Sequence, residues 1–203
     1  MQDLRTAPDP ATGDLPRRGR PRAVDRSEAI LDSVVALFKD VGYDQLRMQD
    51  VADAAGVGLA TIYRRWPTKQ ELVIAALRHS AARTSYPDTG NPRADLAAIF
   101  EQLATDLSGT SCTLRGAMSC LWDDPEVGRV LRDTKIAAMH GHLRDLIGAV
   151  IGTDHPELQL RAELGPALLT YRAVFLADPL PPRDAAREVT ELVLATAEPP
   201  SRR

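Results

Sequence analysis

Apolar residues recur with a helical period along nearly the whole chain. The first stripe runs from Ile30 to Val41, with apolar side chains at offsets of 1, 4, 5, 8 and 11 from Ile30. This spacing puts them on one face of an α-helix. Asp25 and Glu28 resemble a capping box at its start, and Gly42 marks its end. No segment alternates apolar and polar residues for long enough to predict a β-strand, so the pattern predicts an all-α protein.

Short helical segments follow this stripe, and longer ones fill the rest of the chain. The short ones are expected over Met48–Ala55, over residues 58–66, and from a capping box at Thr68–Glu71 onward. After a polar break at residues 85–92, further helices are predicted over residues 96–107, 114–122, 125–151 and 156–175, and after the proline-rich residues 179–182.

The residues between the first two short helices are typical of a helix-turn-helix. Two short helices joined by a few residues must cross steeply, which requires a small residue such as Ala52 at the contact. The turn favours glycine at position 56, where a positive φ is accessible. Apolar Val51, Val57 and Ile62 would fix the crossing angle. The same spacing also suits a plain helical hairpin inside an all-α core.

Polar side chains on the second helix favour the DNA-binding interpretation. Thr61, Tyr63, Arg64 and Arg65 are donors suited to phosphates and base edges. Lys69 lies in the first turn of the next helix, where its charge opposes the helix dipole and a bound phosphate would relieve the conflict.

Composition and charge add two constraints. The net charge is −3, yet residues 1–70 hold 11 Lys/Arg against 10 Asp/Glu, and residues 71–203 hold 14 against 18. Residues 1–22 are rich in Pro, Asp, Arg and Gly, and are expected to form a disordered basic arm with Arg20 and Arg22 near its end. An acidic body with a basic arm suits a protein that touches a polyanion with one end.

The chain is expected to be cytoplasmic. Its 203 residues contain no apolar run as long as a membrane span, and the N-terminus has no apolar core of a secretory signal. The two cysteines, Cys112 and Cys120, are interpreted as reduced, buried small hydrophobes rather than as a disulfide.

Residues 55–72 resemble the signature of the TetR (tetracycline-repressor) family. The stretch reads Ala-Gly-Val-Gly-Leu-Ala-Thr-Ile-Tyr-Arg-Arg-Trp-Pro-Thr-Lys-Gln-Glu-Leu. Residues 29–32, 37–38 and 41–43 also match the first helix of that family and its exit, so the resemblance covers about residues 23–77. It is weaker in the C-terminal part, where Gly165-Pro166 and Tyr171-Arg172 resemble the penultimate helix of one branch.

The resemblance implies an all-helical homodimer with two functional parts. An N-terminal three-helix DNA-binding domain over residues 23–70 would be followed by a ligand-binding and dimerisation domain over residues 71–203. By position, the expected DNA contacts are Gln49, Leu59, Ala60, Thr61 and Arg64 to bases, and Arg47, Tyr63, Arg65 and Lys69 to phosphates. Operator DNA, a small-molecule effector and a second copy of the chain are the implied partners.

Two positions depart from the family pattern. Position 47 is commonly Thr, which caps the second helix and touches phosphate, so Arg47 puts the cap in doubt but keeps a phosphate contact open. Leu59 is apolar where many members carry a polar side chain, and contact with a thymine methyl group is expected there.

The C-terminal part offers candidates for a pocket and for an interface. The large side chains that are candidates for an effector pocket are Phe100, Met118, Trp122, Met139, Tyr171 and Phe175. The last two helices carry more apolar surface than one subunit covers easily, and the predicted dimer interface comprises Leu164, Leu168, Tyr171, Phe175, Val189, Leu192 and Val193.

No cofactor, metal site or enzyme signature is predicted. His140 and His142 are two residues apart and would not share a helix face, and no glycine-rich phosphate loop, HExxH or GxSxG occurs. The alternatives are a structural DNA-binding protein without an effector, and a ligand-binding bundle or enzyme in which the hairpin is only core.

The basic arm has two interpretations. Gly19-Arg20-Pro21-Arg22 has the form of a minor-groove hook, which would favour A·T-rich DNA beside each half-site. A plain basic tail that only neutralises phosphate would show no such preference.

Overall fold

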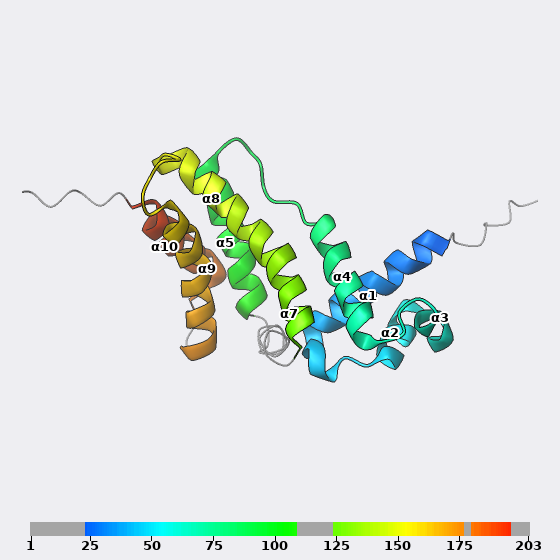
Figure 1. Cartoon of the computed structure of the whole chain (residues 1–203). Coiled ribbons are helices and arrows are strands. Elements are labelled where there is room, and N and C mark those ends of the chain that lie inside the picture. Colours follow the sequence, from blue (N-terminus) through cyan, green and yellow to red (C-terminus); the bar gives the residue numbers. More distant parts are fainter. Residues whose placement is uncertain (1–22, 109–123, 177–179, 196–203) are drawn as a thin grey trace, which may run out of the picture.

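The computed structural model describes residues 23–108, 124–176 and 180–195, and this part of the chain consists of helices and their connections (Figure 1). Arg20, Arg22, Cys112, Met118, Cys120 and Trp122 lie outside the described residues. The helices are α1 (Ala23–Gln45), α2 (Met48–Ala55), α3 (Leu59–Tyr63), α4 (Lys69–Ala82), α5 (Pro92–Ser108), α7 (Pro125–Leu131), the π-turn η1 (Arg132–Ile136), α8 (Ala137–Ile151), α9 (Leu158–Phe175) and α10 (Pro182–Leu194). The predicted all-α fold is confirmed.

Helices α1 to α4 form a head with its own apolar core. α1 packs along α4 and against α2, and α2 packs on α3. Ile30 and Val34 of α1 are fully buried, as are Ile62 of α3 and Leu72 and Val73 of α4. This core continues into α7 through Val127, Val130 and Leu131, so the head is joined to the rest of the subunit by packed side chains.

Helices α5, α8, α9 and α10 form a body around a second core. α5 lies along α10 and also packs on α8 and α9 (Figure 1). Leu96, Phe100, Leu143, Ile147 and Val193 are fully buried there. The predicted boundary between residues 70 and 71 falls inside α4, whose apolar face belongs to the core of the head.

A buried arginine closes the end of the body. Arg161 of α9 is 8% exposed and donates to the carbonyl oxygens of Val193, at 3.0 Å, and Ala195, at 2.5 Å. Its guanidinium also pairs with Glu157, at 2.9 Å. The last carbonyl groups of a helix have no partner within it, so this cation stabilises the end of α10 against α9.

The apolar periodicity predicts where the helices lie more accurately than where each helix begins and ends. The expected helix over Met48–Ala55 is confirmed. The expected helix from Pro125 to Ile151 is a continuous helical path, but residues 132–136 form a π-turn that divides it into α7 and α8. The capping box at Asp25 is wrong, because α1 already begins at Ala23.

Among the described residues, no helix combines the length and the apolar character needed to cross a lipid bilayer.

Candidate DNA-binding surface

The turn between α2 and α3 has the geometry that the sequence predicts. Gly56 has φ 63° and ψ 35°, a left-handed conformation that favours glycine. Its N–H donates to the carbonyl oxygen of Asp53 at 3.2 Å, and the next N–H, of Val57, donates to that of Ala52 at 3.0 Å. Gly58 then returns to extended backbone and precedes α3. The chain thus leaves α2 and enters α3 within three residues.

Apolar side chains fix how α3 lies across α2. Val51 and Ile62 are fully buried, and Ala52 is 1% exposed where the helices approach each other. Val57 and Trp66 are partly buried against the same core. The inward residues of the predicted helix-turn-helix are therefore confirmed, and the opposite face of α3 is held outward by packing.

The outward face collects the side chains that were predicted to contact DNA. Tyr63 is 47% exposed, and Arg64 and Arg65 follow it on the surface. Thr61 is partly exposed, and so is Leu59, which also packs against the core of the head. Further exposed members of the set are Arg47, Gln49 and Ala60. Their division between bases and phosphates stays a prediction.

Two of these side chains have local features that bear on their roles. Arg47 occupies the N-cap of α2 with extended backbone, and its side chain makes no capping hydrogen bond. This fits the departure from threonine noted in the sequence. Gln49 donates from Nε2 to Oδ1 of Asp53 at 2.8 Å, one helical turn further on. The amide has a second N–H and an acceptor oxygen, so a base contact by Gln49 does not require this bond to break.

Lys69 is tied to the exit of α1. Its Nζ donates to the carbonyl oxygen of Tyr43 at 2.9 Å and approaches that of Asp44 at 3.5 Å. The ammonium also lies 4.4 Å from the centroid of the Tyr43 ring, a cation–π contact. An ammonium has three N–H donors, so one remains for the predicted phosphate. Thr68 caps the same helix by accepting from the N–H of Glu71 at 3.1 Å, as the capping box predicts.

Asp124 connects this surface to the body. Its carboxylate accepts from the Tyr43 hydroxyl at 2.6 Å and from the Gln70 amide at 2.9 Å. It also caps α7 by accepting from the N–H of Val127 at 3.2 Å. Burial raises the pKa of Asp124, but these hydrogen bonds outweigh it, and the net pKa lies below its usual value. One ionised side chain thus joins α1, α4 and α7.

The candidate pocket residues in the described part of the chain divide into two pairs rather than lining one cavity. Phe100 is fully buried in the core of the body, and Met139 packs against that core. Tyr171 and Phe175 are 54% and 70% exposed, and their rings stack on each other with centroids 5.3 Å apart. We therefore assign these two rings to the outer face of α9.

The candidate interface residues divide into two groups. Leu164 and Leu192 are exposed, together with Tyr171 and Phe175, whereas Leu168 is partly buried. Val189 and Val193 are 2% and 0% exposed because α10 turns them onto the core of the body, so they are already covered within one subunit. Leu160 and Val174, which were not among the predicted interface residues, extend the exposed stripe of α9.

Asp124 was missed as well, although a local signal for it exists. Asp followed by Pro is a favoured start of a helix, with the carboxylate as N-cap and proline in the first turn. The bonds from Asp124 to Tyr43 and Gln70 span 81 and 54 residues, and no local pattern predicts them.

Comparisons with known proteins agree with this geometry. A model of bacterial regulatory proteins of the TetR family matches residues 30–76, and one of tetracycline-repressor-like C-terminal domains matches residues 86–193. The DNA-binding transcriptional repressor TetR of Mycobacteroides abscessus is 30% identical over 188 residues, which cover 89% of this chain and 98% of the relative.

Solved structures share the fold. A TetR transcription regulator from Haloarcula marismortui has a TM-score of 0.63 at 20% identity, and the match covers 84% of this chain and 97% of the other. The transcriptional regulator FadR from Bacillus subtilis, solved in complex with stearoyl-CoA, has a TM-score of 0.59 at 15% identity, with 84% and 98% covered.

Proposed function

This chain belongs to the TetR family of bacterial regulatory proteins and is a DNA-binding transcriptional regulator, and we propose that it is a repressor which a small-molecule effector releases from its operator. A relative that covers 89% of the chain is named a DNA-binding transcriptional repressor, which supports repression. We also propose that the protein has no enzymatic activity and that it acts in the cytoplasm, where the operator DNA lies.

One observation carries the assignment of the DNA-binding face. The burial of Val51, Ala52 and Ile62 orients α3 so that its polar residues point away from the core. On that face Arg64 would read a base, most simply the O6 and N7 of a guanine, and Tyr63 and Lys69 would hold phosphates. With these contacts α3 would lie in the major groove.

A second copy of the chain completes the proposed regulator. The exposed stripe of α9 and the adjoining Leu192 of α10 offer an apolar face that a twofold partner would cover. A twofold dimer presents two recognition helices to half-sites about 34–36 Å apart, one turn of DNA, or a multiple of it.

An effector is expected because this fold hosts one elsewhere. FadR of B. subtilis, which shares the fold, was solved with stearoyl-CoA. A ligand releases the protein from DNA only if it binds the DNA-free arrangement of the subunit more tightly than the DNA-bound one. A structural DNA-binding protein would show no such response.

The test of DNA recognition starts from duplexes that the full-length protein selects from a random pool. Arg64→Ala should weaken binding by about 1–3 kcal/mol per half-site and relax the preference at one base pair. Tyr63→Ala should weaken all selected duplexes alike, since a phosphate contact carries no sequence information. The salt dependence of binding should stay close to that of the wild type for Tyr63→Ala, because tyrosine is neutral.

Arg144→Ala is the matched control, because this exposed arginine lies on α8 of the body and pairs with its neighbour Asp145. Its affinity for the selected duplexes should equal that of the wild type. If Arg64→Ala and Arg144→Ala behave alike, the outward face of α3 does not read DNA.

A further inference from the structure

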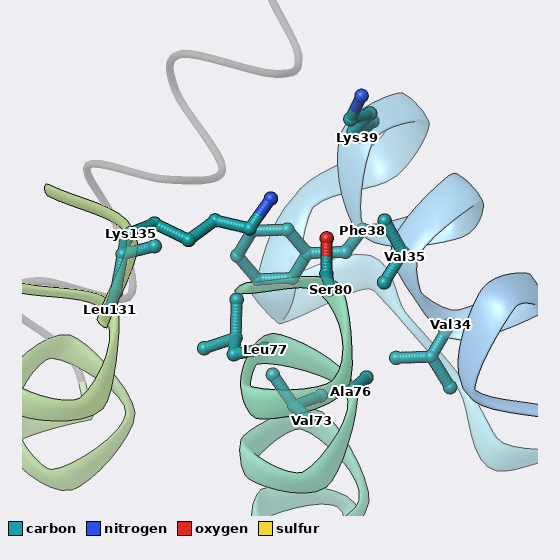
Figure 2. A pocket seen from close by; sticks show the side chains of 10 residues that line it. All are labelled: Val34, Val35, Phe38, Lys39, Val73, Ala76, Leu77, Ser80, Leu131 and Lys135. Carbon is teal, nitrogen blue, oxygen red and sulfur yellow. The ribbon is translucent and has the colours of Figure 1, made fainter. Parts of the chain in front are cut away.

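An apolar cavity of about 140 Å³ lies where the head meets α7 and the π-turn (Figure 2). Val34 and Phe38 come from α1, Val73 and Leu77 from α4, and Leu131 from the end of α7. The only polar side chains among its lining residues are Lys39, Ser80 and Lys135. None of these residues was a candidate for the effector pocket in the sequence.

Two lysines give the cavity a positive edge. The chain has three lysines, and two of them, Lys39 and Lys135, line this cavity. Figure 2 shows the side chain of Lys135 reaching over the Phe38 ring, with both ammonium groups on the same side of the apolar residues. Burial lowers the pKa of Lys135, and the charge of Lys39 lowers it further, whereas Asp106 raises it. An added negative charge would relieve the repulsion between the two ammonium groups.

We propose that this cavity binds a small amphipathic anion, with an apolar tail between Phe38, Leu77 and Leu131 and its anionic group at Lys135 and Lys39. A cavity of this size accepts a group of about six carbon atoms, as a dry cavity of similar volume accepts benzene. The anionic group would form charge-assisted hydrogen bonds with the ammonium groups that line the cavity. A free carboxylate brings its charge directly beside the tail, whereas an acyl thioester has a neutral carbonyl there and carries its negative charges further along the carrier, so these are the two sources to distinguish.

Because the cavity lies between the head and α7, the bound anion would control the position of the head and hence DNA binding. This regulatory role rests on the proposed function. Its walls come from α1 and α4 of the head on one side and from α7 and η1 on the other. A movement of the head against α7 therefore changes the volume of the cavity, and an occupant favours the arrangement that fits it. Asp124 caps the start of α7, and its bonds to Tyr43 and Gln70 reach the first turn of α4, where Lys69 also lies.

The first experiment measures binding to the full-length protein without DNA, by calorimetry with hexanoate. Hexanoate should bind, hexanamide should bind at least tenfold more weakly, and hexylamine should not bind, because only the first brings a negative charge to the lysines. Lys135→Met should weaken hexanoate roughly 10- to 100-fold, the range expected for a lost hydrogen bond to a charged group.

Arg144→Met removes a positive charge from the surface of α8 and should leave hexanoate affinity unchanged. Ala76→Leu, which fills the cavity from α4, should abolish binding. If Ala76→Leu fails to fold, the comparison of Lys135→Met with Arg144→Met decides alone. Equal affinity for hexanoate and hexanamide, or no effect of Lys135→Met, overturns the proposal.

A second readout uses the small number of lysines. Reductive methylation followed by mass spectrometry should show hexanoate protecting Lys39 and Lys135 while Lys69 reacts as before. Hexanoyl-CoA is tested in parallel, and tighter binding than hexanoate with the same protected lysines identifies an acyl thioester as the source. Protection of all three lysines or of none overturns the proposed site.

Release from DNA is measured last, on duplexes selected by the unliganded protein. Saturating hexanoate should lower their affinity at least tenfold, and Lys135→Met should reduce this response without changing the affinity of the unliganded protein. If duplexes are selected but hexanoate does not displace them, the regulatory role of the cavity is overturned and the DNA-binding regulator stands. If no duplex is selected, the proposed function fails whatever hexanoate does.

Discussion

Gly165 sets how closely α9 approaches α5. A Cβ atom at this position would lie 2.5 Å from Cε1 and Cζ of Phe100 and 3.2 Å from Cγ1 of Val189. The Phe100 ring is fully buried, so it has no open space to move into. Gly165→Ala should therefore destabilise the protein by about 1–3 kcal/mol through overpacking, despite the better helix propensity of alanine. Urea unfolding measures the difference.

Gly141→Ala is the control for this substitution. Gly141 lies within α8, and a Cβ atom there meets nothing within 4 Å. The same change of residue should stabilise the protein by about 0.5–1 kcal/mol, because only the backbone entropy of glycine in a helix is removed. If both variants shift the unfolding midpoint in the same direction, close packing at Gly165 does not limit the approach of the helices.

Single residues differ in how far the sequence predicts them. Gly56 and Ile62 were predictable because their roles depend on φ and on helical period, which are local properties. The attachment of Lys69 to Tyr43 was not, since the partner lies 26 residues away and is brought near by the packing of α1 on α4. The resemblance to the family predicts that Lys69 contacts a phosphate. In the structure Lys69 also attaches the start of α4 to the end of α1.

At the scale of elements, α7 is the link between the DNA-binding head and the body. It packs on α4 at one end and continues through the π-turn into α8 at the other. Its first turn is fixed by Asp124, which is also bonded to Tyr43 of α1 and Gln70 of α4. Because the ionised form of Asp124 makes these bonds, their contribution to the stability of the folded protein depends on pH.

Asp124→Asn tests this link through acid denaturation. The pKa of Asp124 lies below its usual value in the folded protein, so its contribution is fully present above the unfolded pKa of about 3.9 and is lost as pH falls through the folded pKa. At pH 7 the variant should be less stable by about 1 kcal/mol, since the amide keeps one acceptor oxygen instead of two and the hydrogen bonds that remain are no longer charge-assisted. The difference from the wild type should shrink when urea unfolding is repeated below pH 4.

Asp145→Asn serves as the reference for this pH dependence. Asp145 is 72% exposed and pairs with Arg144 at 3.5 Å, a surface contact that contributes little. Its substitution should leave stability unchanged at each pH. A constant deficit of Asp124→Asn from pH 7 to pH 3 would show that the charge of Asp124 is not what stabilises the start of α7.

The sequence predicted the helices more reliably than the places where one helix ends and packs against another. The apolar stripe over residues 125–151 correctly gives one helical path, but it does not show the π-turn at residues 132–136, where the period changes for a single turn. Nor does it show that this turn brings Lys135 to the same cavity as Lys39, because that requires α1 and η1 to pack on either side of α4. No pattern in the sequence therefore predicts the cavity between the head, α7 and the π-turn.

At the scale of the whole molecule, the outer face of α9 is not covered by the other described helices of the chain. Leu160, Leu164, Tyr171, Val174 and Phe175 recur at helical spacing and are between 37% and 70% exposed. The sequence predicted an interface of the last two helices but could not tell which face of α10 the body covers. Val189 and Val193 belong to that covered face, so we expect α9 and Leu192 to supply most of the apolar contact.

Phe175→Asp tests the dimer, because the ring is 70% exposed and its loss leaves the core of the subunit intact. In a twofold interface each substitution occurs twice, so a cost of about 2 kcal/mol per subunit raises the dimer Kd roughly 1,000-fold. Sedimentation velocity at micromolar concentration should show a dimer for the wild type and a monomer for Phe175→Asp.

Val150→Asp is the control, at an apolar position on α8 that is 43% exposed and lies outside the stripe, and this variant should remain dimeric. The monomeric variant should also bind selected duplexes more weakly, since one subunit holds only one half-site. A monomeric wild type, or dissociation by Val150→Asp equal to that by Phe175→Asp, would rule out the face of α9 as the interface.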